Sequence, residues 1–194
     1  KLKVCFFKPE SDLNPVTVER YEANILGCTR QFRYSTANTN TIDMALSVNG
    51  IPVVALELKN QFTGQDYICA INQYKNDRSS KEFAFRLNHR FLVYFAVDLY
   101  EVWMTTQLAD SNTRFLPFNQ GSNGAGVTGG AGNPQNPNGY ATSYLWEEVL
   151  QRDSLLDLIH RFISFVKEKE EMVKNGVSRM VTKEKMIFPR YHQY

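Results

Sequence analysis

The stretch Asp43-Met-Ala-Leu-Ser-Val-Asn-Gly-Ile-Pro-Val-Val-Ala-Leu-Glu-Leu-Lys59 predicts two neighbouring strands joined by a turn. Asn49-Gly50 is a strong hairpin signal, and the apolar run that follows it is typical of a strand buried inside a sheet. The first strand begins with an acidic residue, and the second ends in Glu57-Leu58-Lys59. Charges at the end of a buried strand are costly unless they are paired or bind a metal. This end of the sheet is therefore the first candidate for a functional site.

The residue types at this end suit phosphodiester hydrolysis. Mg²⁺ prefers oxygen ligands and is often held by one or two carboxylates together with waters and substrate phosphate. Asp43 and Glu57 would supply the carboxylates, and the backbone carbonyl of Leu58 a third oxygen. Since alternate residues of a strand share a face, Lys59 projects beside Glu57 and could orient the attacking water or neutralise developing charge. The pattern predicts a metal-dependent nuclease, although Glu-x-Lys also occurs on ordinary solvated strands.

The spacing of the two acidic residues makes a structural demand. With a regular two-residue turn at Asn49-Gly50, Asp43 would pair with Leu56 and would not share a face with Glu57. One additional residue, in the turn or in a β-bulge, brings the two carboxylates together. We therefore predict a three-residue loop or a bulge, and Gly50 and Pro52 are the natural places for it.

A series of short segments gives the chain a resemblance to a known family. In order, they are Tyr21-Glu-Ala-Asn, Thr29-Arg-Gln, Asn49-Gly-Ile-Pro, Glu57-Leu-Lys-Asn, Thr63-Gly-Gln, Ala70-Ile-Asn-Gln-Tyr, Phe95-Ala-Val-Asp, Met104-Thr-Thr, Phe115-Leu-Pro-Phe-Asn, Tyr144-Leu-Trp-Glu-Glu-Val-Leu and Phe188-Pro-Arg-Tyr-His-Gln. The set resembles the N-terminal nuclease region of the R subunit of type I restriction-modification enzymes. The resemblance spans nearly the whole chain, which makes it more specific than any single motif.

The resemblance implies an α/β fold of the PD-(D/E)xK restriction-endonuclease type, with a mixed β-sheet flanked by α-helices. It implies Asp43, Glu57 and Lys59 as catalytic residues and Mg²⁺, or Mn²⁺ in its place, as the cofactor. Many such nucleases carry Gln-x-x-x-Tyr on the following helix. Gln73 matches its glutamine and joins the catalytic set, but the fourth residue after it is Asp77, so the motif's tyrosine has no counterpart at that position.

Composition places few limits on the partner. The 194 residues are 43% hydrophobic, enough for one domain with a sizeable core, and the formal net charge of +2 announces no overall basic field. Local basic residues could contact phosphate, although an ordinary solvated surface role is the alternative for each. The DNA-binding candidates are Arg30, Arg33, Lys75 and Arg78. Three cysteines without Cys-x-x-Cys spacing favour a reducing, cytoplasmic setting over a disulfide framework or zinc site.

The rest of the chain gives a coarse secondary structure. We expect strands at 3–7, within 21–35, at 91–97 and at 101–106, and a helix over 63–75 with Thr63 as its N-cap. Residues 119–139 are glycine-rich and predict a flexible loop. Ser143 and Asp153 each predict the start of a helix, and 167–179 predicts a charged helical extension. No apolar run approaches the ~20 residues of a membrane span.

We expect residues 1–166 to form an endonuclease domain. The domain would be N-terminally incomplete, because the family's usual N-terminal helix is not recognisable in the sequence. That helix can bear a further acidic residue, and Glu22 would substitute for it. Residues 167–194 would connect to a helicase or translocase region, and ATP would act only there. By resemblance, the partners are double-stranded DNA and the methyltransferase and specificity subunits of a restriction complex. The alternative is a non-catalytic DNA-docking or subunit-assembly module with structural carboxylates.

Overall fold

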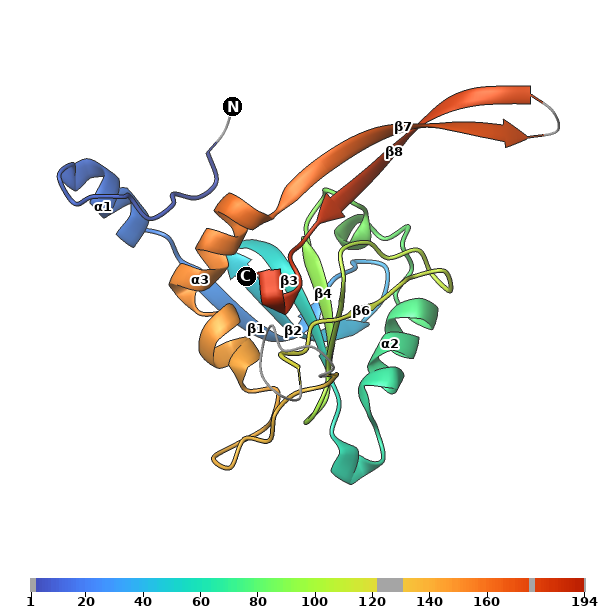
Figure 1. Ribbon diagram of the computed structural model, residues 1–194, viewed down its shortest axis with the longest axis horizontal. Coiled ribbons are helices and arrows are strands. Elements are labelled where there is room, and N and C mark those ends of the chain that lie inside the picture. Colours follow the sequence, from blue (N-terminus) through green and yellow to red (C-terminus); the bar gives the residue numbers. More distant parts are fainter. Residues whose placement is uncertain (1–2, 122–130, 175–176, 194) are drawn as a thin grey trace.

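The computed structural model describes residues 3–121, 131–174 and 177–193. Its centre is a six-stranded mixed sheet in the order β1-β2-β3-β4-β5-β6, in which only β3 and β4 are parallel. The strands are β1 Leu26–Arg33, β2 Thr41–Val48, β3 Ile51–Leu58, β4 Val93–Val97, β5 Val102–Thr105 and β6 Leu116–Pro117. Helices lie on both faces of this sheet (Figure 1), which confirms the predicted α/β fold class.

The β2–β3 hairpin contains the predicted irregularity. Val48 pairs with Ile51 across a two-residue turn, in which Asn49 has φ 50° and Gly50 has φ 81°. Farther from the turn the register shifts, since Ser47 pairs with Pro52 but Leu46 pairs with Val54. Val53 is the additional residue, so the predicted bulge is confirmed, one position beyond Pro52. Such a bulge changes which residues of the two strands share a face.

Helix α2, Tyr67–Asn76, forms the crossover between β3 and β4. Its N-cap is Asp66, whose side chain accepts a hydrogen bond from the backbone of Cys69. The predicted start at Thr63 is wrong, because a short 3-10 helix, Gln61–Thr63, ends at Gly64 in a left-handed conformation. Ala70 and Tyr74 are the buried residues of α2, and they pack with Ala55 and Tyr94 of the sheet.

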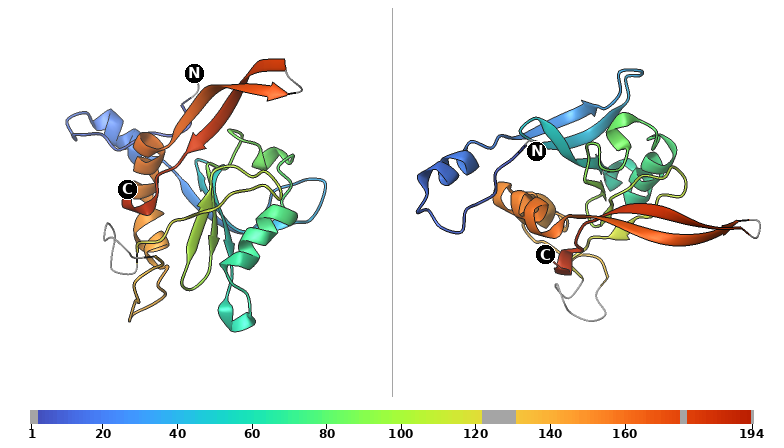
Figure 2. Two further views of the ribbon diagram at one scale, coloured as in Figure 1. Left: turned by 45° about the vertical axis from the view of Figure 1, so that its right-hand side comes forward. Right: turned by 90° about the horizontal axis from the view of Figure 1, so that it is seen from above.

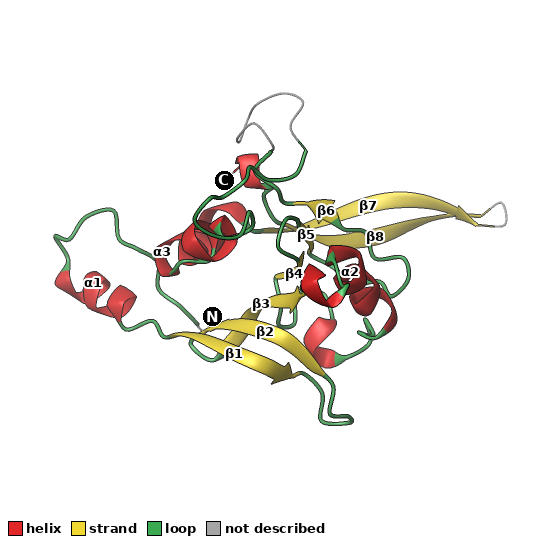
Figure 3. Ribbon diagram, turned by 90° about the horizontal axis from the view of Figure 1, so that it is seen from below, coloured by secondary structure: helices red, strands yellow, loops and turns green. Residues whose placement is uncertain are grey.

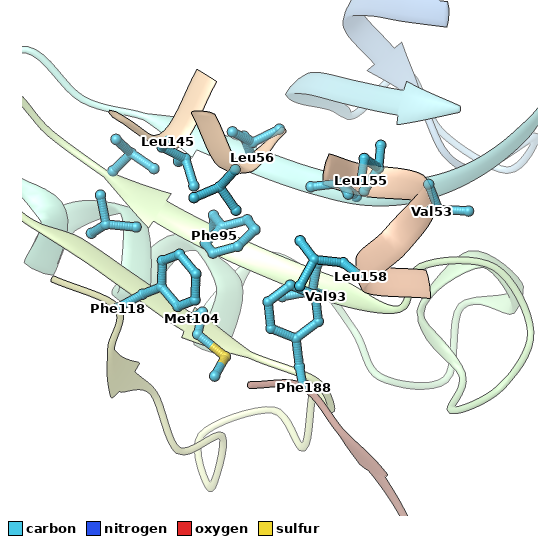
Figure 4. Packing of buried hydrophobic residues seen from close by; sticks show 14 of the residues in the cluster. Val53, Leu56, Val93, Phe95, Met104, Phe118, Leu145, Leu155, Leu158 and Phe188 are labelled. Atoms are coloured by element: carbon cyan, nitrogen blue, oxygen red, sulfur yellow. The ribbon is translucent and has the colours of Figure 1, made fainter. Parts of the chain in front are cut away.

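The opposite face of the sheet carries the larger core. Helical segments Leu145–Val149, α3 Arg152–Asp157 and Leu158–Phe162 cover it, and Figure 3 shows α2 and α3 on opposite sides of the central strands. Figure 4 shows the side chains of Leu145, Leu155 and Leu158 from these segments on the side of the sheet where Phe95 lies. β3 is thus buried on both faces, as its apolar sequence predicts.

The segment after Phe162 differs from the prediction. Strands β7, Ser164–Lys174, and β8, Val177–Ile187, form a separate two-stranded antiparallel sheet. This hairpin extends away from the body of the molecule (Figure 2). The predicted helical extension over 167–179 is therefore wrong. Lysine and glutamate favour helices when considered singly, but here they form cross-strand ion pairs such as Lys167–Glu184.

The N-terminal region also departs from the prediction. Residues 3–7 form no strand, and a short helix, α1 Pro15–Glu22, precedes β1. Asn14 caps α1 by accepting a hydrogen bond from the backbone of Val16, with Pro15 at the first helical position, where it needs no donor. The sequence did not predict α1, and the N-terminally incomplete domain stays a prediction. Within the glycine-rich stretch, 122–130 lie outside the described residues, and the flanks 119–121 and 131–139 form neither helix nor strand.

Candidate active site at the end of strand β3

The bulge places Asp43 and Glu57 at the same level of neighbouring strands. Met44 pairs with Leu56, and continuing this register by one residue brings Asp43 opposite Glu57. The Oδ2 atom of Asp43 accepts a hydrogen bond of 2.9 Å from the backbone of Leu58. Its Oδ1 atom accepts a longer one, 3.3 Å, from Gln31. Asp43 therefore bridges two strands and is fixed beside the end of β3.

Glu57 is fully buried, with an exposed fraction of 0%. Its Oε1 atom accepts a hydrogen bond of 3.0 Å from Nε of Arg78 and lies 2.8 Å from Nη2 in an ion pair. Its Oε2 atom is buried and has no hydrogen-bond partner among the described residues. A buried carboxylate oxygen without a donor is costly. This oxygen would be satisfied by a proton or by a cation.

The electrostatics of Glu57 follow from this arrangement. Burial is the main cause that raises the pKa of its carboxyl group, to about 8; the charge of Arg78 opposes that rise and the charge of Asp43 adds to it. The carboxylate of Asp43 is therefore close enough to repel that of Glu57. Two carboxylates that repel each other in a buried place are stabilised by a shared positive charge.

Arg78 is a residue of this site that the sequence did not place there. It follows α2 directly, its exposed fraction is 5%, and its Nη2 also donates to the backbone oxygen of Thr41 at 2.8 Å. The sequence predicted a DNA contact for Arg78, but its guanidinium is occupied by Glu57 and Thr41. A buried carboxylate needs a cationic partner, so the burial of Glu57 predicts that one is present. The sequence alone does not say which arginine or lysine it is.

Gln31 is a second residue that sequence reasoning missed. Besides its bond to Asp43, it accepts a 2.7 Å hydrogen bond from the hydroxyl of Thr41, and its φ is 50°. Positive φ is uncommon for residues other than glycine. No feature of the local sequence predicts this left-handed backbone conformation at Gln31.

The helix that follows β3, α2, matches the Gln-x-x-x-Tyr motif only in part. Gln73 is half-buried on α2, and the exposed Asp77 stands where the family motif has tyrosine. Tyr74 is fully buried and donates a hydrogen bond to the backbone oxygen of Phe95 at 3.3 Å. Burial raises its pKa, with the charge of Glu57 as the next cause. Tyr74 therefore lies near Glu57, while a role for Gln73 stays a prediction.

Lys59 continues the backbone ladder past β3. Its amide donates to the oxygen of Val97 at 2.8 Å, and its side chain is half-buried. This bond holds Lys59 in strand-like register two residues after Glu57, which is the arrangement that the triplet predicts. The position of its ammonium group relative to the carboxylates is set by its flexible side chain.

The remaining basic and acidic candidates lie in ordinary surroundings. Arg30 is exposed, and Arg33 is exposed with its Nε bonded to the backbone oxygens of Ser35 and Asn38. Lys75 is half-buried. Their contacts with DNA stay predictions.

Glu22 ends α1, on the far side of the molecule from α2 in Figure 1, and pairs with Arg152 at 3.5 Å. This ion pair links α1 to α3. Its substitution for the acidic residue of the family's N-terminal helix stays a prediction that this contact does not support.

The donor set that could hold a metal is small. Within 3–121, 131–174 and 177–193, no three His, Cys, Asp or Glu side chains are clustered as metal ligands. The two carboxylates of Asp43 and Glu57, with the Leu58 carbonyl, make an all-oxygen set, which suits Mg²⁺ or Mn²⁺ because these ions keep several waters. The unpartnered Oε2 of Glu57 beside Asp43 is the observation that fits such an ion.

Comparison with known protein families decides the relationship. Residues 8–113, more than half of the chain, match the family described as type I restriction enzyme R protein N terminus. The chain belongs to this family. The match contains Asp43, Glu57, Lys59, Gln73 and Arg78. No curated protein and no solved structure matches the chain.

Membership confirms the resemblance seen in the sequence and the restriction-endonuclease-like fold. It places the chain in the setting of a type I restriction-modification system. Among the helices that the structure describes, none combines the length and the apolar character needed to cross a membrane.

Proposed function

We propose that this chain is the Mg²⁺-dependent endonuclease region of a type I restriction enzyme R subunit. It would cleave double-stranded DNA in a complex whose translocation is driven by ATP in other regions. The observation that supports this proposal is the unpartnered buried oxygen of Glu57 beside Asp43, with Lys59 two residues further along the strand.

Each residue has a separate task in this proposal. Asp43 and Glu57 would hold the ion with the backbone carbonyl of Leu58, and Mn²⁺ could replace Mg²⁺. When bound, the ion supplies Lewis acidity and a water of lowered pKa. Lys59 orients the attacking water and offsets negative charge on the phosphate. The water oxygen forms a bond to phosphorus, one ester P–O bond breaks, and the leaving oxygen takes up a proton.

The surrounding fold supports this division of labour. Asp43 is fixed by the Leu58 amide, and Glu57 is fixed by Arg78. Carboxylates whose positions are set before the ion arrives require little reorganisation on binding. We infer that sequence recognition and DNA translocation reside in the methyltransferase and specificity subunits and in a motor region.

The test compares wild type with Asp43→Ala and Glu57→Gln. Mn²⁺ and Mg²⁺ are titrated by calorimetry, and nicking of supercoiled plasmid is measured in parallel. We expect both variants to lose metal binding and nicking. Glu168→Gln, which alters an exposed acidic residue of the β7–β8 hairpin, is the matched control and should behave as wild type.

The competing function is a DNA-docking or assembly module with the same fold. The Arg78–Glu57 ion pair is the observation that favours it, because that contact already gives Glu57 a structural role. If wild type, Asp43→Ala and Glu57→Gln bind metal equally weakly, and if the R subunit carrying either substitution still assembles and cleaves DNA, the nuclease proposal is rejected.

A further inference from the structure

We propose that Arg78 is a positioning residue that binds one oxygen of Glu57 and thereby presents the other oxygen to the cation. This inference rests on the proposed function, since it concerns how the same site holds its ion. It assigns a task to a residue outside the Asp, Glu-x-Lys and Gln-x-x-x-Tyr motifs.

The contact between the two side chains is specific to one oxygen. Nε of Arg78 donates to Oε1 of Glu57 at 3.0 Å, and Nη2 lies 2.8 Å from the same oxygen as its ion-pair partner. Oε2 receives no donor from the described residues, and Asp43 acts as a nearby charge on the same carboxyl group. Arg78 thus leaves the two oxygens of one carboxylate unequal, with only Oε2 lacking a protein donor.

Arg78 is itself held from three directions. Its Nη2 donates to the backbone oxygen of Thr41 at 2.8 Å, and its Nη1 to that of Asp77 at 3.4 Å. Its guanidinium lies 5.5 Å from the centre of the Tyr34 ring. These contacts come from the start of β2, the end of α2 and the segment after β1. A guanidinium fixed in this way cannot follow the carboxylate if it turns.

The Thr41 contact links Arg78 to the other carboxylate as well. Thr41 is two residues before Asp43 on β2, and its hydroxyl donates to Gln31, which in turn donates to Asp43. Arg78 therefore fixes Glu57 relative to the strand that carries Asp43. We infer that it sets the separation of the two carboxylates as well as the orientation of one.

A lysine could not do the same. It has a positive charge but no planar pair of donors, so it cannot bind Oε1 and the Thr41 oxygen with fixed geometry. Hydrogen-bonding partners of metal ligands typically change metal affinity about 10- to 100-fold when they are replaced. Arg78→Lys therefore separates geometry from charge.

The experiment measures Mn²⁺ affinity by calorimetry and the Mn²⁺ paramagnetic resonance spectrum of Arg78→Lys and wild type. We expect the dissociation constant of Arg78→Lys to rise about 10-fold or more, with a changed spectrum. Arg152→Lys is the matched control, since Arg152 also pairs with a glutamate and lies over a tyrosine ring, but at the surface between α1 and α3. It should leave affinity and spectrum unchanged.

Two results would overturn the inference. Unchanged affinity in a folded Arg78→Lys variant would make Arg78 purely structural, and tighter binding would mean that the fixed geometry of its guanidinium hinders the ion. Failure of the proposed function would give a different result: the wild type, Asp43→Ala and Glu57→Gln would all bind the metal with the same affinity.

A measurement on wild type alone covers the case in which Arg78→Lys does not fold. Infrared difference spectra with isotopically labelled glutamate carboxyl groups distinguish a carboxylate that binds Mg²⁺ through one oxygen from one that uses two. We expect one-oxygen binding. A two-oxygen signal would contradict the assignment of Oε1 to Arg78.

Discussion

The end of β3 and the β7–β8 hairpin both contain pairs of a carboxylate and a cation, in opposite environments. At the end of β3, the side chains of Arg78 and Glu57 are 6% and 0% exposed. In the hairpin, Lys185 and Glu168 lie 2.7 Å apart with side chains 46% and 44% exposed. The same chemical contact therefore serves two purposes. Water already stabilises the charges of the hairpin, whereas each buried charge depends on its partner.

This difference has a consequence for function. In the hairpin, each paired lysine of one strand neutralises a glutamate of the other strand, and these pairs need no further ligand. The buried pair leaves one carboxylate oxygen without a donor. An incomplete arrangement of this kind is retained at the cost of stability, which is what a site prepared for a ligand would show.

Removing one member of the buried pair should give the largest effect. Arg78→Ala removes the ion-pair partner and the hydrogen-bond donor of the buried Glu57 carboxyl group, so we expect the free energy of unfolding to fall by about 3–5 kcal/mol. Urea denaturation of the metal-free protein measures it. The double variant Glu57→Leu/Arg78→Leu, which removes both charges, should recover much of the loss. If it were as unstable as Arg78→Ala, lost packing rather than lost pairing would be the cause.

The second prediction uses pH to change the ionisation of Glu57 in the buried pair. Because the folded-state pKa of Glu57 is raised from 4.5 to about 8, its contribution to stability is fully present below about pH 4.5 and is lost as pH rises through about 8. The metal-free protein should thus lose about 2–4 kcal/mol of unfolding free energy between pH 5 and pH 9. Glu57→Gln should flatten this dependence. An equal slope in that variant would assign the effect to other groups.

A neutral hydrogen bond near the buried pair sharpens the comparison. Tyr74→Phe removes the hydroxyl that donates to the backbone oxygen of Phe95 and keeps the ring in the core. We expect a loss of about 1 kcal/mol in thermal or urea unfolding. A loss as large as that of Arg78→Ala would show that the hydroxyl also supports the charged pair.

The exposed pair should give the smallest effect. A double-mutant cycle on Lys185→Ala and Glu168→Ala should yield a coupling energy below about 1 kcal/mol, which salt weakens further. The cycle is measured by urea unfolding at low and high ionic strength. A salt-insensitive coupling of several kcal/mol would remove the contrast between the two regions.

Much of the central hairpin could be predicted because its sequence carries strong local signals. Asn49-Gly50, the apolar run after it and the positions of Asp43 and Glu57 together required an irregular register, and the bulge at Val53 supplies it. The parallel neighbour β4 and its partner β5 were likewise readable from buried apolar runs.

The hairpin and the Arg78 contact show where sequence reasoning ended. The alternating Lys and Glu residues from 167 onward favour a helix by propensity, whereas Asn175-Gly176 is a hairpin signal in the sequence. Arg78 pairs with a residue 21 positions earlier, and that contact depends on how α2 packs against β3. Propensity and local pattern do not encode such packing.

The bulge at Val53 also imposes a parity on the distance along the chain between the two acidic residues. A two-residue turn without a bulge pairs residues whose numbers differ by an odd amount, as Val48 and Ile51 do. Asp43 and Glu57 differ by an even amount, so one unpaired residue must lie between them. A chain one residue shorter, with Val53 deleted, would restore an uninterrupted ladder and still set the two carboxylates face to face. The bulge therefore accommodates one residue of chain length without moving the acidic pair apart.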